Sequence, residues 1–294
     1  MITIFTPTYN RAYILPKLYE SLKRQTIKDF EWIIVDDGST DNTEQIVEYW
    51  VNTEKEFCIV YKKQSNSGKH VAINTGVSMA SFEWFFIVDS DDYITDDAIE
   101  NIEKWILTDL DEQYAGVSGT KCFNNMKNVG QDIKFSSDYV DCKNNERSRY
   151  GLVGDKAEVY RTSILKKYPF PHFPGEKFLS ECAVWDRIAI DGYKIRWFNH
   201  PLMVIEYLDD GLTSKINKLE LENFSGYTYA TNIRLKAYGG VEHYRLIAQY
   251  INKALHKNIG IKEIAKNINQ NIMFIFVLSI VVKIKNKLYG DKVI

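Results

Sequence analysis

The sequence lacks several features that would assign this chain of 294 residues to a specialised class of protein. It has only four cysteines, Cys58, Cys122, Cys142 and Cys182. They form neither a C-x-x-C pair nor a Cys/His cluster with zinc spacing, so we expect reduced thiols in a cytosolic protein. The N-terminus has no basic segment followed by an apolar core, and we therefore expect no secretory signal.

A strong net charge, internal repeats and low-complexity linkers are also missing. The formal net charge is −2, so the charge of the whole chain gives no argument for binding to nucleic acid. An apolar segment near the C-terminus, residues 273–282, has only Ser279 as a polar residue. About 20 apolar residues are needed to span a bilayer as a helix, and this segment is too short. It predicts either a helix packed on the core or an anchor in the membrane interface.

The charge that is present is unevenly distributed. Residues 241–294 contain nine Lys or Arg against three acidic residues, a net charge of +6 that leaves −8 for the rest of the chain. Lys283, Lys285 and Lys287 directly follow the apolar segment. This combination favours peripheral contact with an anionic membrane, so we expect a cytoplasmic protein on the inner face of the plasma membrane.

Apolar runs and turn residues predict an α/β protein. The first hundred residues alternate strands and helices in the manner of a doubly wound sheet. The predicted strands are residues 2–6, 32–35, 57–61 and 84–88, and the predicted helices are residues 15–25, 43–52, 69–79 and 96–107.

The second half has a weaker pattern. Residues 114–150 predict mixed strands and loops, and later segments predict further elements. These are a helix at 160–168 before Pro169, a helix at 179–190, a strand or hairpin at 194–207 and a helix at 219–238. We divide the chain into residues 1–112 and 113–212, two halves of one domain, and a helical C-terminal extension, 213–294.

Two of the predicted strands end at clustered carboxylates. Asp36 and Asp37 follow one strand, and Asp89, Asp91 and Asp92 follow another. Carboxylates this close repel one another unless a cation lies among them, and oxygen ligands suit Mg²⁺ or Mn²⁺. The alternative is an acidic loop that caps the helix beginning near Asp96. The first interpretation predicts a metal-dependent nucleotide site.

Polar side chains at four strand ends extend this prediction, because the carboxyl ends of parallel strands meet at one ligand crevice. Asp36 can accept a hydrogen bond from the imide N–H of uracil, and Lys69 or Arg11 can offset phosphate charge. A divalent ion on Asp91 would bridge two phosphates and stabilise the departing nucleoside diphosphate. We assign these residues to nucleotide-sugar binding: Thr6, Pro7, Thr8, Tyr9, Asn10, Arg11, Asp36, Asp37, Gly38, Ser39, Asn66, Gly68, Lys69, Asn74, Asp89 and Ser90.

Four motifs together carry a resemblance to a known family. Residues 6–11 (TPTYNR), 35–41 (VDDGSTD), 66–68 (NSG) and 88–92 (VDSDD) resemble the N-terminal half of family 2 glycosyltransferases of the GT-A fold, of the kind found in bacterial polysaccharide synthesis. The resemblance covers about the first 110 residues, and it implies that residues 1–112 are the nucleotide-sugar-binding half of the domain and residues 113–212 the acceptor-binding half. It implies a Rossmann-like, doubly wound mixed sheet and transfer that inverts the anomeric centre. It also implies that Asp36 contacts the nucleoside and that residues 89–91 are a D-x-D element, with Asp91 and Asp89 as ligands of Mn²⁺ or Mg²⁺.

The general base should lie in the second half, where the family usually has a Glu-Asp pair at the start of a helix. Glu181 matches the Glu, but Cys182 replaces the Asp. We take Glu181 as the first candidate and Asp186 as the second, because the chemistry requires a carboxylate near the anomeric carbon. The alternative for Glu181 is a residue that interacts with the helix dipole. His70, His172 and His200 are candidates for a third metal ligand, although a lone His is more often a satisfied structural residue.

The predicted function is therefore transfer of a sugar from a nucleotide-sugar, most simply a UDP-sugar, to a glycan or lipid-linked glycan acceptor. A phosphatase-like aspartyl motif is less suitable, because it requires Thr or Val where Tyr93 stands. A nucleotidyltransferase would favour a Gly-rich basic loop after the first strand, and residues 7–10 do not form one. A non-catalytic protein that binds sugar nucleotides is the third alternative.

Overall fold

The computed structural model of the chain describes residues 1–130, 137–206 and 215–289. Its first half alternates strands and helices, as predicted, and the first four strands are parallel. The elements are β1 (Ile2–Thr8), α1 (Leu15–Lys23), β2 (Phe30–Asp36), α2 (Thr43–Thr53), β3 (Cys58–Lys63), α3 (Lys69–Met79), β4 (Trp84–Ile87), β5 (Tyr93–Ile94) and α4 (Ala98–Ile106).

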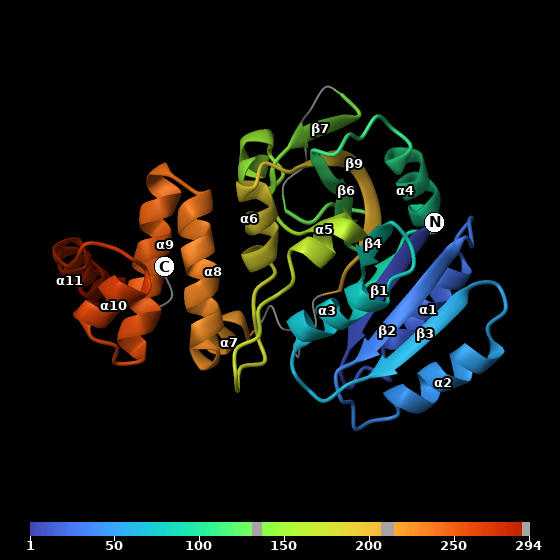
Figure 1. Cartoon of the computed structure of the whole chain (residues 1–294), viewed down its shortest axis with the longest axis horizontal. Coiled ribbons are helices and arrows are strands. Elements are labelled where there is room, and N and C mark those ends of the chain that lie inside the picture. Colours follow the sequence, from blue (N-terminus) through green and yellow to red (C-terminus); the bar gives the residue numbers. More distant parts are fainter. Residues whose placement is uncertain (131–136, 207–214, 290–294) are drawn as a thin grey trace.

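The second half adds strands of both directions to the same sheet. Its elements are β6 (Tyr114–Cys122), β7 (Tyr139–Cys142), the 3₁₀ helix η1 (Asn144–Tyr150), β8 (Lys156–Arg161), α5 (Thr162–Lys167), α6 (Cys182–Ile190) and β9 (Lys194–Val204). β8 runs antiparallel to β4 and β6, whereas β9 is parallel to β6. Among the described residues the strand order is β3-β2-β1-β4-β8-β6-β9-β5, with β7 paired to β9. The predicted α/β fold with a mixed sheet is confirmed (Figure 1).

Both faces of the first strands are buried. Leu18 of α1 and Trp50 of α2 pack in the same core cluster as Trp32 of β2, and α3 contributes to the cluster on the other face. A Cβ atom at Gly76 of α3 would lie 2.2 Å from the ring of Phe5. Glycine at this position therefore lets α3 lie directly against β1, which fixes the helix that carries Lys69.

Two predicted helices of this half begin later in the structure. The helix predicted at 160–168 begins only at Thr162, because Tyr160 and Arg161 complete β8 and pair with β4. The helix predicted at 179–190 begins at Cys182. Residues 194–204 form one long strand, in agreement with the strand alternative, and residue 207 lies outside the described residues. The pairing of β8 with β4 joins residues about 75 positions apart, which local periodicity does not report.

The C-terminal region is helical, as predicted. It contains α7 (Ile216–Glu222), α8 (Phe224–Ala237), α9 (Gly240–His256), α10 (Ile261–Asn267) and α11 (Ile272–Tyr289). The single helix predicted at 219–238 is broken at Asn223, whose φ of −115° and ψ of 58° are not helical. The Asn223 side chain accepts hydrogen bonds from the backbone N–H of Lys177 at 2.7 Å and of Phe178 at 3.1 Å. A tertiary contact therefore accounts for the break.

A second contact joins the same loop to the helices. The carboxylate of Glu176 accepts hydrogen bonds from the backbone N–H of Ser225 and of Gly226, both at 2.8 Å. These are N–H groups of the first turn of α8, which have no partner within the helix. Glu176 thus caps α8, and the loop before α6 is held to the start of the C-terminal helices.

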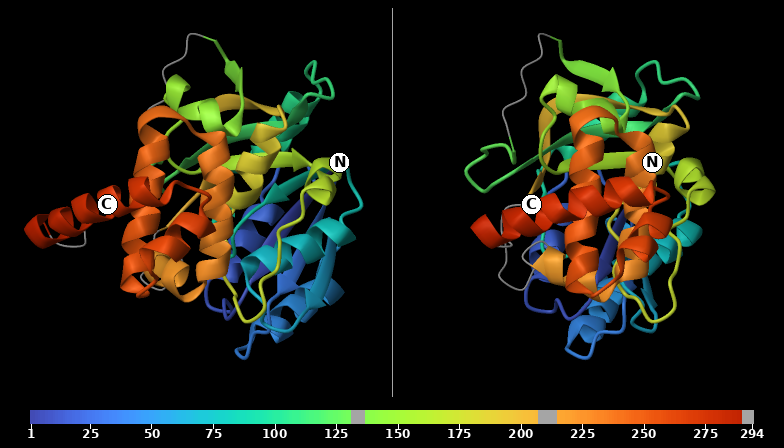
Figure 2. Two further views of the ribbon diagram at one scale, coloured as in Figure 1. Left: turned by 60° about the vertical axis from the view of Figure 1, so that its left-hand side comes forward. Right: turned by 90° about the vertical axis from the view of Figure 1, so that its left-hand side faces the viewer.

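The C-terminal helices have their own apolar core. Tyr250 and Ile251 of α9, Ile264 of α10 and Ile275 of α11 belong to one buried cluster, and α8 packs against α6 (Figure 2). Within residues 1–130, 137–206 and 215–289, no single helix has the length and hydropathy needed to cross a bilayer; α10 and α11 reach them only as a pair bent by 114°. The boundary that we place after residue 112 precedes β6, and the one after residue 212 lies outside the described residues.

Candidate active site

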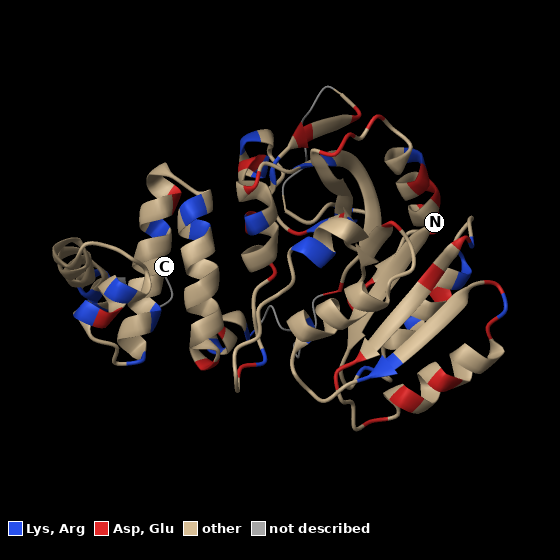
Figure 3. Ribbon diagram, viewed as in Figure 1, with Lys and Arg blue, Asp and Glu red and all other residues tan. Residues whose placement is uncertain are grey.

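A cleft of about 1460 Å³ lies where the loops after β1, β2, β3 and β4 face α6, η1, β8 and the start of the C-terminal helices. Both charge signs occur in the loops between α6 and the sheet (Figure 3). The predicted site residues that line the cleft are Pro7, Thr8, Tyr9, Asn10, Arg11, Asp37, Asn66, Gly68, Lys69, Asp89, Ser90, Asp91, Glu181 and Asp186. Most of the predicted residues are therefore brought together.

Five predicted residues lie outside the lining of the cleft. Thr6 accepts a hydrogen bond from the indole N–H of Trp32 at 2.9 Å, and Ser39 accepts one from the backbone N–H of Asn10 at 2.8 Å. Asn74 exchanges two hydrogen bonds with the backbone of Phe170, at 2.8 and 2.9 Å. The remaining two are Asp36 and Gly38.

Asp36 is fully buried at the end of β2. One of its oxygens accepts a hydrogen bond from the backbone N–H of Ser39 at 2.7 Å, and the other accepts one from the hydroxyl of Tyr61 at 2.8 Å. A carboxylate can accept about four hydrogen bonds, so these two contacts orient Asp36 without saturating it. Its contact with a nucleoside remains a prediction.

Asp37 organises the loop that precedes α3. Its carboxylate accepts hydrogen bonds from the backbone N–H of Ser67 at 2.8 Å and of Gly68 at 2.7 Å. Gly68 has φ of +97°, and a Cβ atom there would lie 2.0 Å from the carbonyl oxygen of Lys177. Only glycine meets both conditions. The loop after β3 is thereby held against the loop before α6, with Lys69 in the first turn of α3.

Lys69 connects the two halves of the cleft. Its ammonium lies 2.6 Å from a carboxylate oxygen of Asp89 and 2.6 Å from a carboxylate oxygen of Glu181. Burial lowers the pKa of Lys69, but the charges of Asp89 and Glu181 outweigh it and raise the pKa above its ordinary value. The residue is therefore a fixed positive charge between the end of β4 and the start of α6.

The acidic residues after β4 differ in their surroundings. Burial raises the pKa of Asp89, but Lys69 and Lys121 outweigh it, so the net shift is downward. Burial and the charge of Asp89 raise the pKa of Asp91, whose carboxylate lies 3.9 Å from Arg11. Burial, with Asp89 and Asp91 nearby, raises the pKa of Asp92 to about 7 despite Lys121 at 3.4 Å. An incompletely compensated negative charge therefore remains at Asp91.

This charge and donor set fit a divalent cation held together with a diphosphate. Mg²⁺ is commonly bound through one or two carboxylates plus substrate phosphates rather than by an all-protein cage. In the described parts of the chain, no three His, Cys, Asp or Glu side chains are arranged to hold a metal ion. The three histidines therefore do not complete a site with Asp89 and Asp91, and His200 instead lies 3.2 Å from Asp97.

Glu181 lies at the N-terminal end of α6, but its side chain makes no capping hydrogen bond. The carboxylate points to Lys69 instead, which argues against the alternative of a residue that serves only the helix terminus. The next residue, Cys182, lies 3.2 Å from the hydroxyl of Ser180, and burial raises the pKa of its thiol to about 11. A thiol with this pKa is protonated near neutral pH and cannot replace a carboxylate as a base.

Asp186 is fully buried one turn further along α6. One oxygen accepts hydrogen bonds from the amide of Asn144 at 2.8 Å and from the hydroxyl of Tyr238 at 3.2 Å. Burial raises the pKa of Asp186. The Asp186 carboxylate joins η1, α6 and the end of α8. These contacts are typical of a structural residue, whereas Glu181 contacts Lys69 in the cleft.

Several polar residues of the cleft were not among the predicted site residues. Lys121 of β6, Arg147 of η1 and Glu158 of β8 come from three separate elements. Glu158 has 16% of its side chain exposed and lies 3.5 Å from Arg147. Burial raises its pKa to about 7, although Arg147 and Lys121 oppose this shift. Glu158 is the one acidic residue within the strand KAEVYR. The helix predicted at 160–168 overlaps the end of this strand, so the local pattern does not point to Glu158.

Comparisons with known proteins agree with this geometry. The sequence profile described as "Glycosyl transferase family 2" matches residues 3–168. "Glycosyltransferase GlyA" of Streptococcus pneumoniae is 38% identical over 106 residues, which are 36% of this chain and 15% of that relative. The Campylobacter jejuni "GalNAc(5)-diNAcBac-PP-undecaprenol beta-1,3-glucosyltransferase" is 24% identical over 95% of this chain and 93% of the relative.

A solved structure shares the fold. S. aureus TarS 1-349 in complex with UDP-GlcNAc superposes with a TM-score of 0.63 at 18% identity, over 98% of this chain and 91% of that one. The likeness covers the mixed sheet and the helical region, and it confirms the predicted GT-A fold.

Proposed function

The chain belongs to glycosyl transferase family 2, and we propose that it transfers a sugar from a UDP-sugar to a glycan or lipid-linked glycan with inversion at the anomeric carbon. The observation that carries the proposal is the Lys69 bridge. It brings Glu181, the candidate base, to the strand-end loops that would hold the nucleotide.

The donor would occupy the loops after β1, β2 and β3. Backbone groups of residues 7–10 and the side chains of Arg11 and Lys69 line the cleft there. Cationic side chains in this position can bind a diphosphate, whereas Asp36 behind them can accept a hydrogen bond from the N–H of a nucleobase such as uracil. TarS, which shares the fold, has been solved with UDP-GlcNAc, and this supports a UDP-sugar as the first donor to test.

Asp89 and Asp91 would hold Mn²⁺ or Mg²⁺. A divalent cation bound to them would neutralise charge on the two phosphates and make the nucleoside diphosphate a better leaving group. Arg11 and Lys69 would contribute fixed positive charge on the same side. Arg11 and Lys69 would orient the diphosphate in the cleft and stabilise the negative charge that it gains when the bond to the sugar breaks.

Glu181 would accept the proton of the acceptor hydroxyl. In an inverting displacement the acceptor oxygen attacks the anomeric carbon from the face opposite to the leaving diphosphate, so the base must reach the sugar from that face. Glu181 directly precedes α6 and lines the same cleft as the loops after β3 and β4, where it contacts Lys69. Asp186 is the second candidate, but its hydrogen bonds to Asn144 and Tyr238 favour a structural role.

The acceptor class follows from the relatives and is part of the proposal. The Campylobacter jejuni relative is named for an undecaprenol-linked glycan acceptor. An acceptor of this kind would place the enzyme at the cytoplasmic face of the plasma membrane.

A panel of UDP, GDP and dTDP sugars tests the function. The protein is incubated with each donor, Mn²⁺ or Mg²⁺ and an extract of lipid-linked glycans. We expect release of UDP and a raised melting temperature with the matching donor. Release of pyrophosphate would indicate a nucleotidyltransferase instead. A raised melting temperature without release of a nucleoside diphosphate would indicate the non-catalytic alternative.

A further inference from the structure

The last helix of the described chain has two different long faces. The side chain of Asn271 accepts hydrogen bonds from the backbone N–H of Met273 at 2.9 Å and of Phe274 at 3.3 Å, which starts α11 sharply. Ile275 and Val282 are buried in the core of the C-terminal helices. This inner face already accounts for the position of α11 on the protein.

The opposite face is apolar and exposed. Eight apolar side chains have at least 45% of their surface exposed: Ile272, Met273, Phe276, Val277, Ile280, Val281, Ile284 and Leu288. They recur every four residues in two adjoining rows, so they form one stripe along the helix, which we call the outer stripe. Exposed apolar patches of this extent mark sites of association.

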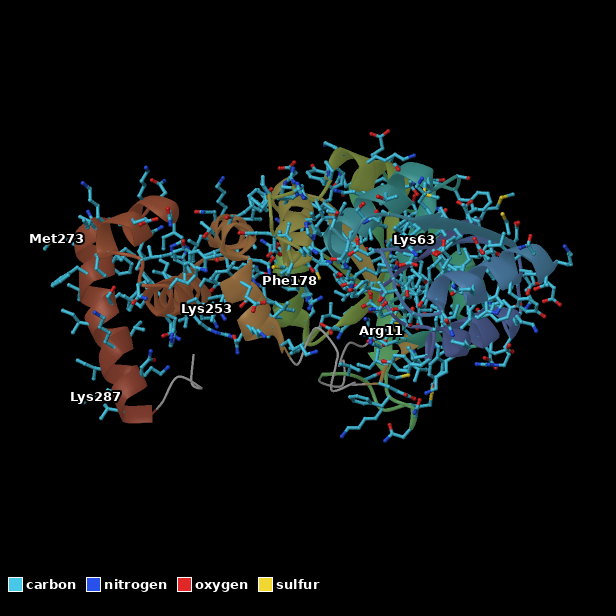
Figure 4. The ribbon with its side chains drawn as sticks, turned by 90° about the horizontal axis from the view of Figure 1, so that it is seen from below. Arg11, Lys63, Phe178, Lys253, Met273 and Lys287 are labelled. Atoms are coloured by element: carbon cyan, nitrogen blue, oxygen red, sulfur yellow. The ribbon has the colours of Figure 1, made fainter. Side chains whose placement is uncertain are left out.

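The outer stripe lies at the edge of the molecule. Met273 and Lys287 lie near the two ends of α11, on the side of the C-terminal helices remote from the sheet (Figure 4). In the left view of Figure 2, the C-terminal half of α11 extends beyond the neighbouring helices. Nothing within the described chain covers the stripe there.

The charge around the stripe has one sign. Residues 264–290 contain four lysines, Lys266, Lys283, Lys285 and Lys287, and no Asp or Glu. Lys283 and Lys287 are exposed and alternate with Ile284 and Leu288 of the stripe. If two copies met through their outer stripes, Lys283 and Lys287 of one copy would lie near the same lysines of the other, and like charges repel.

We propose that the outer stripe of α11 docks this protein onto a phospholipid bilayer that contains anionic headgroups, with the helix lying in the plane of the interface. An interfacial helix of this type buries its apolar side at the boundary between headgroups and acyl chains, and its lysines attract anionic lipid. A bilayer surface satisfies both the apolar stripe and the single sign of charge. This surface is separate from the residues that would bind the donor, so docking does not depend on the proposed transfer reaction.

The experiment uses the full chain and sedimentation with vesicles. Vesicles of phosphatidylcholine alone are compared with vesicles that also contain phosphatidylglycerol, at low and high salt. The first variant is Phe276→Glu with Ile280→Glu, and the second is Lys283→Glu with Lys287→Glu. The matched control is Val241→Glu, because Val241 is 86% exposed on α9 outside the stripe. Circular dichroism and the melting temperature show whether each variant is folded.

We expect the wild type and the Val241 control to bind the anionic vesicles and to be released by salt. Each double variant should lower the partition coefficient by about tenfold or more. The proposal is overturned if folded wild-type protein binds neither vesicle, binds both equally, or binds as well after either double substitution. It is also overturned if sedimentation velocity shows a dimer that Phe276→Glu with Ile280→Glu dissociates, while vesicles bind nothing.

Discussion

The ammonium of Lys69 and the carboxylate of Glu181 are 2.6 Å apart, although the two residues belong to opposite walls of the cleft. Lys69 comes from the first turn of α3, and Glu181 precedes α6. This ion pair therefore joins the loop after β3 to the candidate base, and it is the first contact to test.

Replacing Lys69 should reduce turnover strongly. Lys69→Met leaves the half-buried carboxylates of Asp89 and Glu181 without their common partner and removes a cation from the proposed diphosphate site. We expect kcat to fall by about 10²-fold or more, as for other fixed electrostatic groups. Steady-state release of UDP measures it. The control is Lys63→Met, because Lys63 pairs with Glu44 and does not line the cleft. Equal losses in both variants would contradict a special role for Lys69.

Removing the base function of Glu181 should affect transfer more than donor binding. Glu181→Gln keeps the size of the side chain but cannot accept the proton, so we expect a loss of about 10² to 10⁴ in kcat with the donor Kd little changed. Calorimetry and single-turnover transfer separate the two quantities. In Asp186→Asn we expect instead a lower melting temperature. Near-normal transfer by Glu181→Gln, with a large loss in a folded Asp186→Asn protein, would reverse the assignment.

Asp91 should be required for metal-dependent turnover. Asp91→Asn removes one of the two carboxylates proposed to hold the metal ion, and activity should drop below about 1% of the wild type at saturating Mn²⁺. Treatment of the wild type with EDTA should have the same effect and be reversed by added metal. Asp96→Asn is the control, because Asp96 pairs with Arg24 on the surface. Activity that survives both EDTA and Asp91→Asn would disprove the metal role.

The raised pKa of Glu158 predicts that the stability of the protein depends on pH. Burial raises the pKa of Glu158 to about 7 in the folded protein. At pH values between the ordinary pKa of a glutamate and about 7, the folded state therefore binds a proton that the unfolded state has released. The free energy of unfolding should therefore decrease as the pH rises from about 5 to about 8. In Glu158→Gln this decrease should become smaller. It should not vanish, since the raised pKa of Asp92 acts in the same direction.

Thermal melting across this pH range measures the effect. The groups that act on the Glu158 carboxylate are Arg147, Lys121, Glu181 and Asp155. Glu83→Gln, at an exposed position, serves as the control. If wild-type protein and Glu158→Gln show the same slope of melting temperature against pH, Glu158 does not titrate in this range.

The sequence predicts the first half of the fold well because its strands and helices are encoded locally. Apolar runs such as residues 32–35 end at turn residues, and helical spacing resumes directly after them. The same locality brings Asp89 and Lys69 to one edge of the sheet. Glu181 was predicted from the resemblance, not from spacing.

The rest of the site depends on contacts that no local pattern reports. Tyr160 was assigned to a helix, but it pairs with Phe85 of β4 and stacks on Trp185 at 4.4 Å. Lys121 of β6 and Glu158 of β8 reach the cleft because these two strands extend the sheet beyond β4. The break at Asn223 likewise arises from hydrogen bonds to residues 177 and 178.

The loop before α6 is bonded to the C-terminal helices by four hydrogen bonds, two to the side chain of Asn223 and two from α8 to Glu176. Residues 176–178 lie only a few positions before Glu181. Lys177 also packs against Gly68 of the loop after β3. The segment that precedes the candidate base is therefore positioned by the C-terminal helices as well as by the sheet, so the helical region contributes to the shape of the cleft.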